Sequence, residues 1–149
     1  MAVRHNSKQR TSLMVAPALI LCCVDYRYIQ AVQQFVKQRL KVSRYNLKTD
    51  AGGTRALVKG PRAVQAWIWR NLTLAYEQQG VRQVFLFHHQ DCLLYGGSKA
   101  FATLQQEAAT HRQDLRRAQT LLTKRFQGLK VAAFYAHHTT RGITFTAVS

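Results

Sequence analysis

The chain has 149 residues, 47% of them apolar, which suits one domain with a hydrophobic core and excludes a disordered chain. It carries 22 Lys and Arg against 6 Asp and Glu, and this formal net charge of +16 predicts an anionic environment or a partner such as nucleic acid, unless the charges only solvate the surface. No stretch approaches the roughly 20 apolar residues that span a bilayer. We therefore expect one domain over residues 1–149 that does not enter a membrane.

Residues 1–17 are predicted to form a basic tail. Arg4, Lys8 and Arg10 precede an apolar run at 13–24, an order that loosely mimics a secretory signal. Pro17 interrupts that run, and no small-residue cleavage site follows it, so we favour a tail followed by a buried strand. An organellar address stays open, because the tail lacks acidic residues and contains arginine.

The cysteines indicate a reducing compartment. There are three, an odd number, and Cys22 and Cys23 are adjacent, so they cannot easily bridge each other. Disulfide frameworks belong to oxidising compartments, which makes a cytoplasmic location the better expectation.

Apolar patterning predicts strands that alternate with helices. Short bounded apolar runs predict strands at 18–24, 45–49, 84–87, 131–136 and 143–148. Helical spacing predicts helices at 28–40, at 63–79 after Pro61, and at about 98–126 with Ser98 as the N-cap. This alternation predicts an α/β fold, with a mostly parallel central sheet of four strands plus an edge strand and helices on both faces.

Metal-ligating side chains follow two of the predicted strands. Cys23 ends the first strand, and His89 and Cys92 follow another. In such sheets ligands collect outside the carboxyl ends of the strands, and the His-x-x-Cys spacing lets both side chains reach one ion. A single strand-end cysteine is more often a small core residue. Together, however, two thiolates and one imidazole are natural zinc ligands that leave a fourth position for water.

These segments resemble motifs of the β-carbonic anhydrases. Residues 23–27, Cys-Val-Asp-Tyr-Arg, resemble the family's Cys-x-Asp-x-Arg motif, and residues 89–92, His-Gln-Asp-Cys, resemble its His-x-Asp-Cys motif. The turn at 50–53, Asp-Ala-Gly-Gly, is similar to an Asn-Ala-Gly-Gly or Asn-Ala-Gly-Asn turn. Leu93 and His88 stand where the family usually has glycine, which indicates a short, divergent branch.

The resemblance implies that Cys23, His89 and Cys92 hold zinc and that Asp25 and Arg27 form a catalytic dyad. It also implies that the turn glycines, Gly52 and Gly53, belong to the substrate pocket. A carboxylate near a metal-bound hydroxide can accept its proton, and an adjacent arginine fixes that carboxylate and keeps it ionised. The alternative for the dyad is a simple salt bridge. Either water or Asp25 could be the fourth zinc ligand.

The implied activity is the zinc-dependent, reversible hydration of carbon dioxide to bicarbonate. One alternative is the hydrolysis of carbon disulfide or carbonyl sulfide at the same site. Another is an inactive, zinc-stabilised module that binds anions or nucleic acid through its basic surface. Covalent catalysis by a phosphatase-type Cys-x5-Arg loop fails on spacing, because position 98 is Ser98.

The remaining expectations concern the surroundings of the site. Because neighbours in a strand point in opposite directions, His88 is expected to be a filler or a supporting residue, and Cys22 a core residue. His137 and His138 could line the same rim. The resemblance implies a homodimer or a larger even assembly, and Trp67, Trp69 and Tyr76 give one helix an aromatic excess that favours it.

Overall fold

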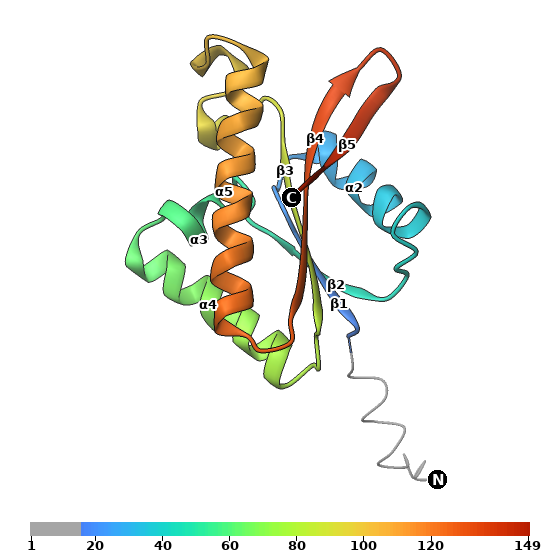
Figure 1. Cartoon of the computed structure of the whole chain (residues 1–149), viewed down its shortest axis with the longest axis vertical. Coiled ribbons are helices and arrows are strands. Elements are labelled where there is room, and N and C mark those ends of the chain that lie inside the picture. The colour runs from blue at the N-terminus through green and yellow to red at the C-terminus, as the bar shows by residue number, and fades with distance from the viewer. Residues whose placement is uncertain (1–15) are drawn as a thin grey trace, which may run out of the picture.

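The computed structural model describes residues 16–149, so nearly all of the predicted basic tail lies outside the described residues (Figure 1). Strands and helices alternate along the chain in the order β1 (Ala18–Cys22), α2 (Tyr26–Gln38), β2 (Tyr45–Thr49), α3 (Arg55–Lys59), α4 (Arg62–Glu77), β3 (Gln83–His89), α5 (Leu104–Arg125), β4 (Lys130–Thr139) and β5 (Gly142–Val148). Two short 3-10 helices, Leu93–Tyr95 and Ser98–Ala100, connect β3 to α5.

The five strands form one sheet in the order β2-β1-β3-β4-β5. The first four are parallel, and β5 pairs with β4 in the antiparallel direction. The predicted sheet of four parallel strands plus an edge strand is therefore confirmed. Because β1 and β3 are parallel neighbours, with Leu21 opposite Leu86, the residues that follow them emerge at the same edge of the sheet.

Helices cover both faces of the sheet, as the alternation predicted: α2 lies on one face, and α3, α4 and α5 lie on the other (Figure 1). Under α2, an apolar cluster gathers side chains that include Val32, Phe85 and Phe87. On the opposite face, α4 and α5 contribute Leu72, Leu122 and many other apolar residues to a larger cluster. Among the helices of residues 16–149, none combines the length and apolar character that crossing a membrane requires.

Two element boundaries differ from the prediction for visible reasons. Strand β1 stops at Cys22, because the chain turns at Asp25, whose side chain accepts the Arg27 N–H and caps α2. The long helix begins at Leu104 and not at Ser98. Its N-cap is Thr103, which accepts the Gln106 N–H at 3.1 Å. The Ser98 hydroxyl donates instead to the Glu107 carboxylate, so the predicted N-cap was wrong.

Candidate metal centre

The structure brings together the three predicted zinc ligands. Cys23 follows β1 directly, His89 ends β3, and Cys92 lies three residues further on. One potential ligand atom from each, the two sulfurs and an imidazole nitrogen, lie within 4.8 Å of one another, and all three residues are buried. Two sulfurs and one nitrogen at this spacing suit a tetrahedral zinc ion with one position left open.

The orientation of His89 leaves one ring nitrogen free to bind a metal. Its Nδ1 lies 2.7 Å from the backbone carbonyl of Gln90, so Nδ1 carries the proton and Nε2 carries the lone pair. Nε2 is buried and has no hydrogen-bond partner among the described residues. The ring is also held by Tyr28, which stacks on it at 4.0 Å between centroids. A histidine fixed through one nitrogen while the other is unpartnered has the arrangement of a metal ligand.

The two cysteine thiols differ in their tendency to ionise. Hydrogen bonds from Cys92 and from the Gly52 N–H, the latter at 3.3 Å, outweigh burial and lower the pKa of Cys23 to about 4. The same contact with Cys23, together with burial, raises the pKa of Cys92. Cys23 is therefore the thiol that loses its proton more readily, and a divalent cation bound by both sulfurs would also displace the proton of Cys92. The third cysteine, Cys22, packs in the apolar cluster under α2, which confirms its interpretation as a core residue.

Asp25 and Arg27 form a tight pair beside the cluster. The Asp25 Oδ2 atom accepts from Arg27 Nη2 at 2.7 Å, and the Arg27 Nε–H lies 3.0 and 3.1 Å from the two carboxylate oxygens. The guanidinium holds the pKa of Asp25 below its usual range, so this carboxylate is ionised. Asp25 Oδ2 is 3.9 Å from the free Nε2 of His89. The Asp25 carboxylate is therefore close to the ligands but directed toward Arg27.

Arg27 also reaches a residue that sequence reasoning had not placed in the dyad. Its Nη1 donates to Asp91 Oδ2 at 2.9 Å, and its Nη2 donates to the Asp91 carbonyl at 3.0 Å. Asp91 stands between His89 and Cys92 in the sequence. Arg27 consequently connects the segment after β1 with the segment after β3.

The turn after β2 supports the cluster from behind. Gly52 and Gly53 have φ angles of 78° and 62°, a region that favours glycine. A Cβ on Gly53 would lie 2.8 Å from His88 Cδ2 and 2.8 Å from the Phe87 carbonyl oxygen. Gly52 donates its N–H to the Cys23 sulfur. The turn thus contacts the site through a ligand atom.

A cavity of about 560 Å³ opens beside the cluster. Its polar lining consists of two buried cysteines and three partly exposed charged residues, Cys23, Cys92, Asp25, Arg27 and Asp91. Its mouth is apolar and exposed, formed by Val24, Tyr26, Leu93 and Leu94. Gly52 and Gly53 do not line this cavity. An apolar entrance above two thiols and an ion pair admits a small uncharged molecule without a large desolvation cost.

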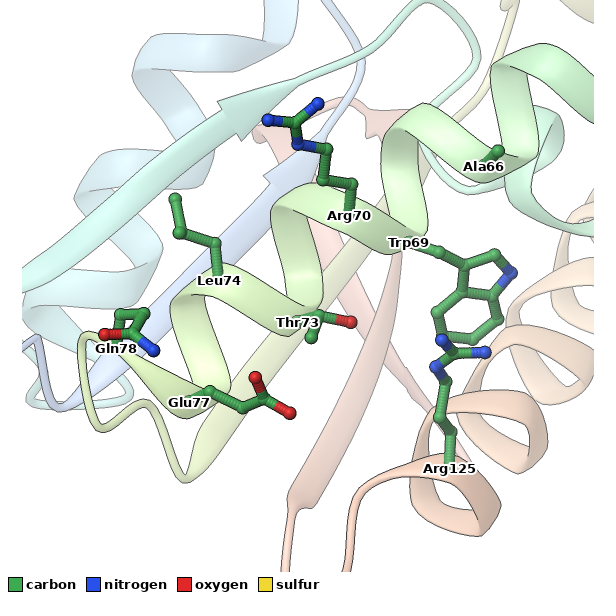
Figure 2. A pocket seen from close by; sticks show the side chains of 8 residues that line it. All are labelled: Ala66, Trp69, Arg70, Thr73, Leu74, Glu77, Gln78 and Arg125. Atoms are coloured by element: carbon green, nitrogen blue, oxygen red, sulfur yellow. The ribbon is translucent and has the colours of Figure 1, made fainter.

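A groove on α4 is separate from this site (Figure 2). Figure 2 shows the Arg125 side chain beneath the indole of Trp69, where its guanidinium carbon lies 4.7 Å from the ring centroid. Of the three aromatic residues predicted to favour a partner subunit, Trp69 and Tyr76 pack against Phe126. Only Trp67, which is 59% exposed, keeps a large free surface.

Sequence reasoning missed a buried polar stripe on α5. Glu107, His111 and Asp114 are at most 1% exposed and recur at helical spacing, which was the available signal. Glu107 accepts the Asp91 N–H at 2.6 Å, His111 lies 3.0 Å from His88 between their Nδ1 atoms, and Asp114 accepts the Tyr95 hydroxyl at 2.7 Å. Each residue of the stripe thus contacts a segment that follows or ends β3.

The other histidines have different surroundings. His88 is buried on the face opposite His89, where its Nε2 accepts the Thr54 N–H at 3.0 Å and contacts the Thr54 hydroxyl at 2.7 Å. This position confirms His88 as a supporting residue. His137 and His138 line a separate cavity of about 330 Å³ and not the rim beside the cysteines. The possibility that they line the rim is not realised, because β4 extends to Thr139 and carries them past that edge.

Four parallel strands with an antiparallel edge strand, and a Cys-His-Cys cluster at the carboxyl edge of the sheet, agree with the class that the motifs implied, the β-carbonic anhydrases. The profile of the family described as "Putative carbonic anhydrase" matches residues 15–145, and the chain belongs to this family. An uncharacterized protein of Rickettsia conorii is 24% identical over 138 residues, which covers 89% of this chain and 73% of that protein. A second uncharacterized protein, from Rickettsia bellii, is 23% identical and covers 89% and 83%.

Solved carbonic anhydrases share the fold. The enzyme from Streptococcus mutans superposes with a TM-score of 0.60 at 15% identity, covering 95% of this chain and 92% of that one. The enzyme from Glaciozyma antarctica gives a TM-score of 0.56 at 16% identity, covering 100% of both chains. The resemblance inferred from the motifs is therefore confirmed at the level of family and fold.

Proposed function

We propose that this protein is a zinc enzyme that reversibly hydrates carbon dioxide to bicarbonate, with the ion held by Cys23, His89 and Cys92. The observation that carries the proposal is the buried cluster of two thiols and a histidine whose Nε2 has no partner. Bound zinc would supply an acidified water at the fourth position. Because two thiolates donate more charge than two imidazoles would, activity should favour alkaline pH.

The chain's own residues have separable roles in this proposal. Asp25, ionised and held by Arg27, is placed to accept a proton near the open position. Arg27 keeps Asp25 from turning toward the His89 nitrogen 3.9 Å away. The apolar mouth around Leu93 and Leu94 suits a linear uncharged substrate. Carbon disulfide and carbonyl sulfide share that shape and electrophilic carbon, and they are the alternative substrates.

The zinc assignment is tested by two cysteine variants. Wild-type protein and Cys22→Ser should each contain one zinc per chain, because Cys22 lies on the other face of the strand end. Cys92→Ser should lose most of the metal and also some stability, because ligand binding is linked to folding. Elemental analysis after dialysis against buffer measures the content. Full zinc occupancy in Cys92→Ser would refute the ligand set.

The catalytic roles are tested by stopped-flow hydration assays at alkaline pH on zinc-loaded protein. Arg27→Ala should keep zinc and lose nearly all activity, because Asp25 is left without its cationic partner and can occupy the open position. Asp25→Ala should keep zinc with low activity. Arg39→Ala, which removes an exposed cation at the other end of α2, is the matched control and should match the wild type. Equal rates in all four proteins would reduce the dyad to a salt bridge.

A second candidate function follows from where the acidic residues lie. Asp25, Asp91, Asp50 and Asp114 are ion-paired with Arg27, Lys48 and Lys59, and Glu107 is buried. Few carboxylates remain to neutralise the other basic side chains, so the positive charge is concentrated on the surface. We therefore propose, as the alternative, an inactive zinc-stabilised module that binds a polyanion such as nucleic acid.

Salt separates the two candidates. Binding of a labelled single-stranded RNA through its phosphates should weaken steeply between 50 and 200 mM salt, by about 300-fold or more for six or more contacts. Hydration of an uncharged gas should change little over the same range. Wild-type protein that is fully loaded with zinc but inactive on carbon dioxide and on the sulfur analogues, and that binds RNA in this way, would favour the module.

Assembly and location complete the proposal. We propose a homodimer or larger even assembly, for which the exposed Trp67 on α4 offers apolar surface, and a cytoplasmic location, which suits three free, buried cysteines. Light scattering at micromolar concentration tests the first of these. A purely monomeric species would overturn it.

A further inference from the structure

The loop that carries Cys92 has a backbone conformation that side chains rarely adopt. Asp91 has a φ of 59°, in the left-handed region, where a residue other than glycine persists only if its neighbours hold it. Four groups of this residue are engaged at once. Its N–H bonds to Glu107, its Oδ1 accepts the Ser98 N–H at 2.9 Å, and its Oδ2 and carbonyl oxygen both accept from Arg27. Asp91 is therefore the junction between α5 and the Asp25–Arg27 dyad.

Glu107 is the partner of this junction on the α5 side. Its carboxyl group is 0% exposed, and its two oxygens accept the Asp91 N–H at 2.6 Å and the Ser98 hydroxyl at 2.7 Å. Within residues 16–149 no Lys or Arg forms a salt bridge with it. Burying a carboxyl group without a cation is unfavourable, and two hydrogen bonds to one short loop are what compensate it here.

Further along the same helix, buried positions are filled by Leu115 and Leu122, so an apolar side chain would be the ordinary choice for a buried position of α5. An apolar residue at position 107 would leave the Asp91 N–H without an acceptor. The hydrogen bonds of Glu107 therefore fix the geometry of the loop, a role that an apolar core residue at this position could not perform.

We propose that Glu107 is a positioning residue for the metal centre: it fixes the backbone of Asp91, Asp91 holds Arg27, and Arg27 holds Asp25. The same constraint fixes Cys92, the next residue in the loop. The inference rests on the proposed zinc site, because it assigns to Glu107 a role in orienting that site's residues.

Two variants and one control separate positioning from general stability. Glu107→Ala removes both hydrogen bonds. Glu107→Gln keeps an oxygen for the Asp91 N–H and can donate its amide to the Ser98 hydroxyl, so it should restore the geometry. Glu77→Ala is the matched control, because Glu77 is an exposed glutamate on α4.

The first readout is zinc affinity, measured by competition with a chromophoric chelator at one pH. Loss of a residue that supports a metal site typically lowers the metal affinity by 10–100-fold. We expect a decrease of that size in Glu107→Ala, and a decrease of less than about 3-fold in Glu107→Gln and Glu77→Ala. The second readout uses metal-free, ¹⁵N-labelled protein. The Arg27 Nε–H signal should be protected from solvent exchange in the wild type and in Glu107→Gln, and unprotected in Glu107→Ala.

Each outcome decides a separate question. A Glu107→Ala protein with wild-type zinc affinity and a protected Arg27 Nε–H would overturn the positioning role. If that variant does not fold, Glu107→Asp, which withdraws the carboxyl by one methylene, supplies the same comparison. A wild type that binds no zinc would refute the proposed function, while the Arg27 signal would still decide whether Glu107 positions the dyad.

Discussion

The two halves of α5 are buried against the same sheet by different chemistry. Near the metal cluster the helix buries Glu107, His111 and Asp114, whose polar atoms bond to the loop after β3 and to His88. Away from it, the helix buries Leu115 and Leu122 in the larger apolar cluster. Burial near the site thus fixes directions, because hydrogen bonds depend on angle, whereas burial in the apolar half mainly removes surface from water. The two contributions should be separable by mutation.

The apolar half should respond to truncation with the largest loss of stability. Leu122→Ala removes a fully buried side chain, and we expect a loss of about 3 kcal/mol in the free energy of unfolding. Leu121→Ala, at a neighbour that is 40% exposed, should cost less than about 1 kcal/mol. Urea titrations of metal-free protein measure both. The zinc content of the folded variants should equal that of the wild type. Loss of zinc from folded Leu122→Ala would contradict the separation between the apolar half of α5 and the metal site.

The half of α5 that buries polar side chains, its polar half, packs on His88, and the turn at Gly53 contacts the other side of this histidine. Gly53→Ala and Gly128→Ala both place a methyl group on a left-handed residue, but only at Gly53 does the new atom meet neighbours, at 2.8 Å. We expect Gly53→Ala to be the more destabilising by about 2 kcal/mol, the typical cost of overpacking. Gly128 has no atom within 4 Å of the built Cβ, so it isolates the backbone strain. Equal losses of stability in the two variants, measured by urea unfolding, would show that the His88 side chain can move aside without an energetic cost.

Acidification should reduce the stability that the polar half of α5 contributes more than the stability that the apolar half contributes. Burial, followed by the field of His89, lowers the pKa of His111 to about 3, against about 6.5 in an unfolded chain. Between those values the unfolded chain binds a proton that the folded chain does not, so stability falls as the pH drops below 6.5. From pH 7.5 to 5.5 this single histidine should remove about 1.4 kcal/mol.

The measurement compares urea unfolding of metal-free wild type with His111→Phe at those two pH values. The variant lacks the titrating group, so its loss of stability on acidification should be smaller by that amount. An identical pH dependence in the two proteins would mean that His111 is protonated in the folded state or exposed to water.

The fold was largely predictable because its strands are short, apolar and bounded. The strand predicted at 45–49 has those bounds in the structure, and the order of strands in the sequence correctly predicted that Cys23, His89 and Cys92 lie together. Helix α3 was not predicted, since five residues give no clear helical period. Ser98 and Thr103 are both acceptable N-caps, and only the tertiary contact of Ser98 with Glu107 decides between them.

The support of the candidate site was the least predictable part. A buried glutamate, histidine and aspartate on one helix contradict the expectation that such residues face solvent, so their spacing indicated a shared face of the helix but not the burial of that face. Their burial depends on partners more than 15 residues away along the chain, such as Asp91 for Glu107. Likewise, the separation of His137 and His138 from the cysteines depends on how far β4 continues beside β5.

Strand β3 ends with two adjacent histidines that serve opposite faces of the sheet, His89 toward the cysteines and His88 toward Thr54 and His111. Adding or deleting a single residue upstream in β3 would therefore exchange the two faces, placing the supporting imidazole among the thiols and the ligand against α5. The length of this strand is consequently as restricted as its chemistry. Natural and engineered changes in chain length should be tolerated in connections such as the β4–β5 turn, where the strands can be extended without changing which side either histidine faces.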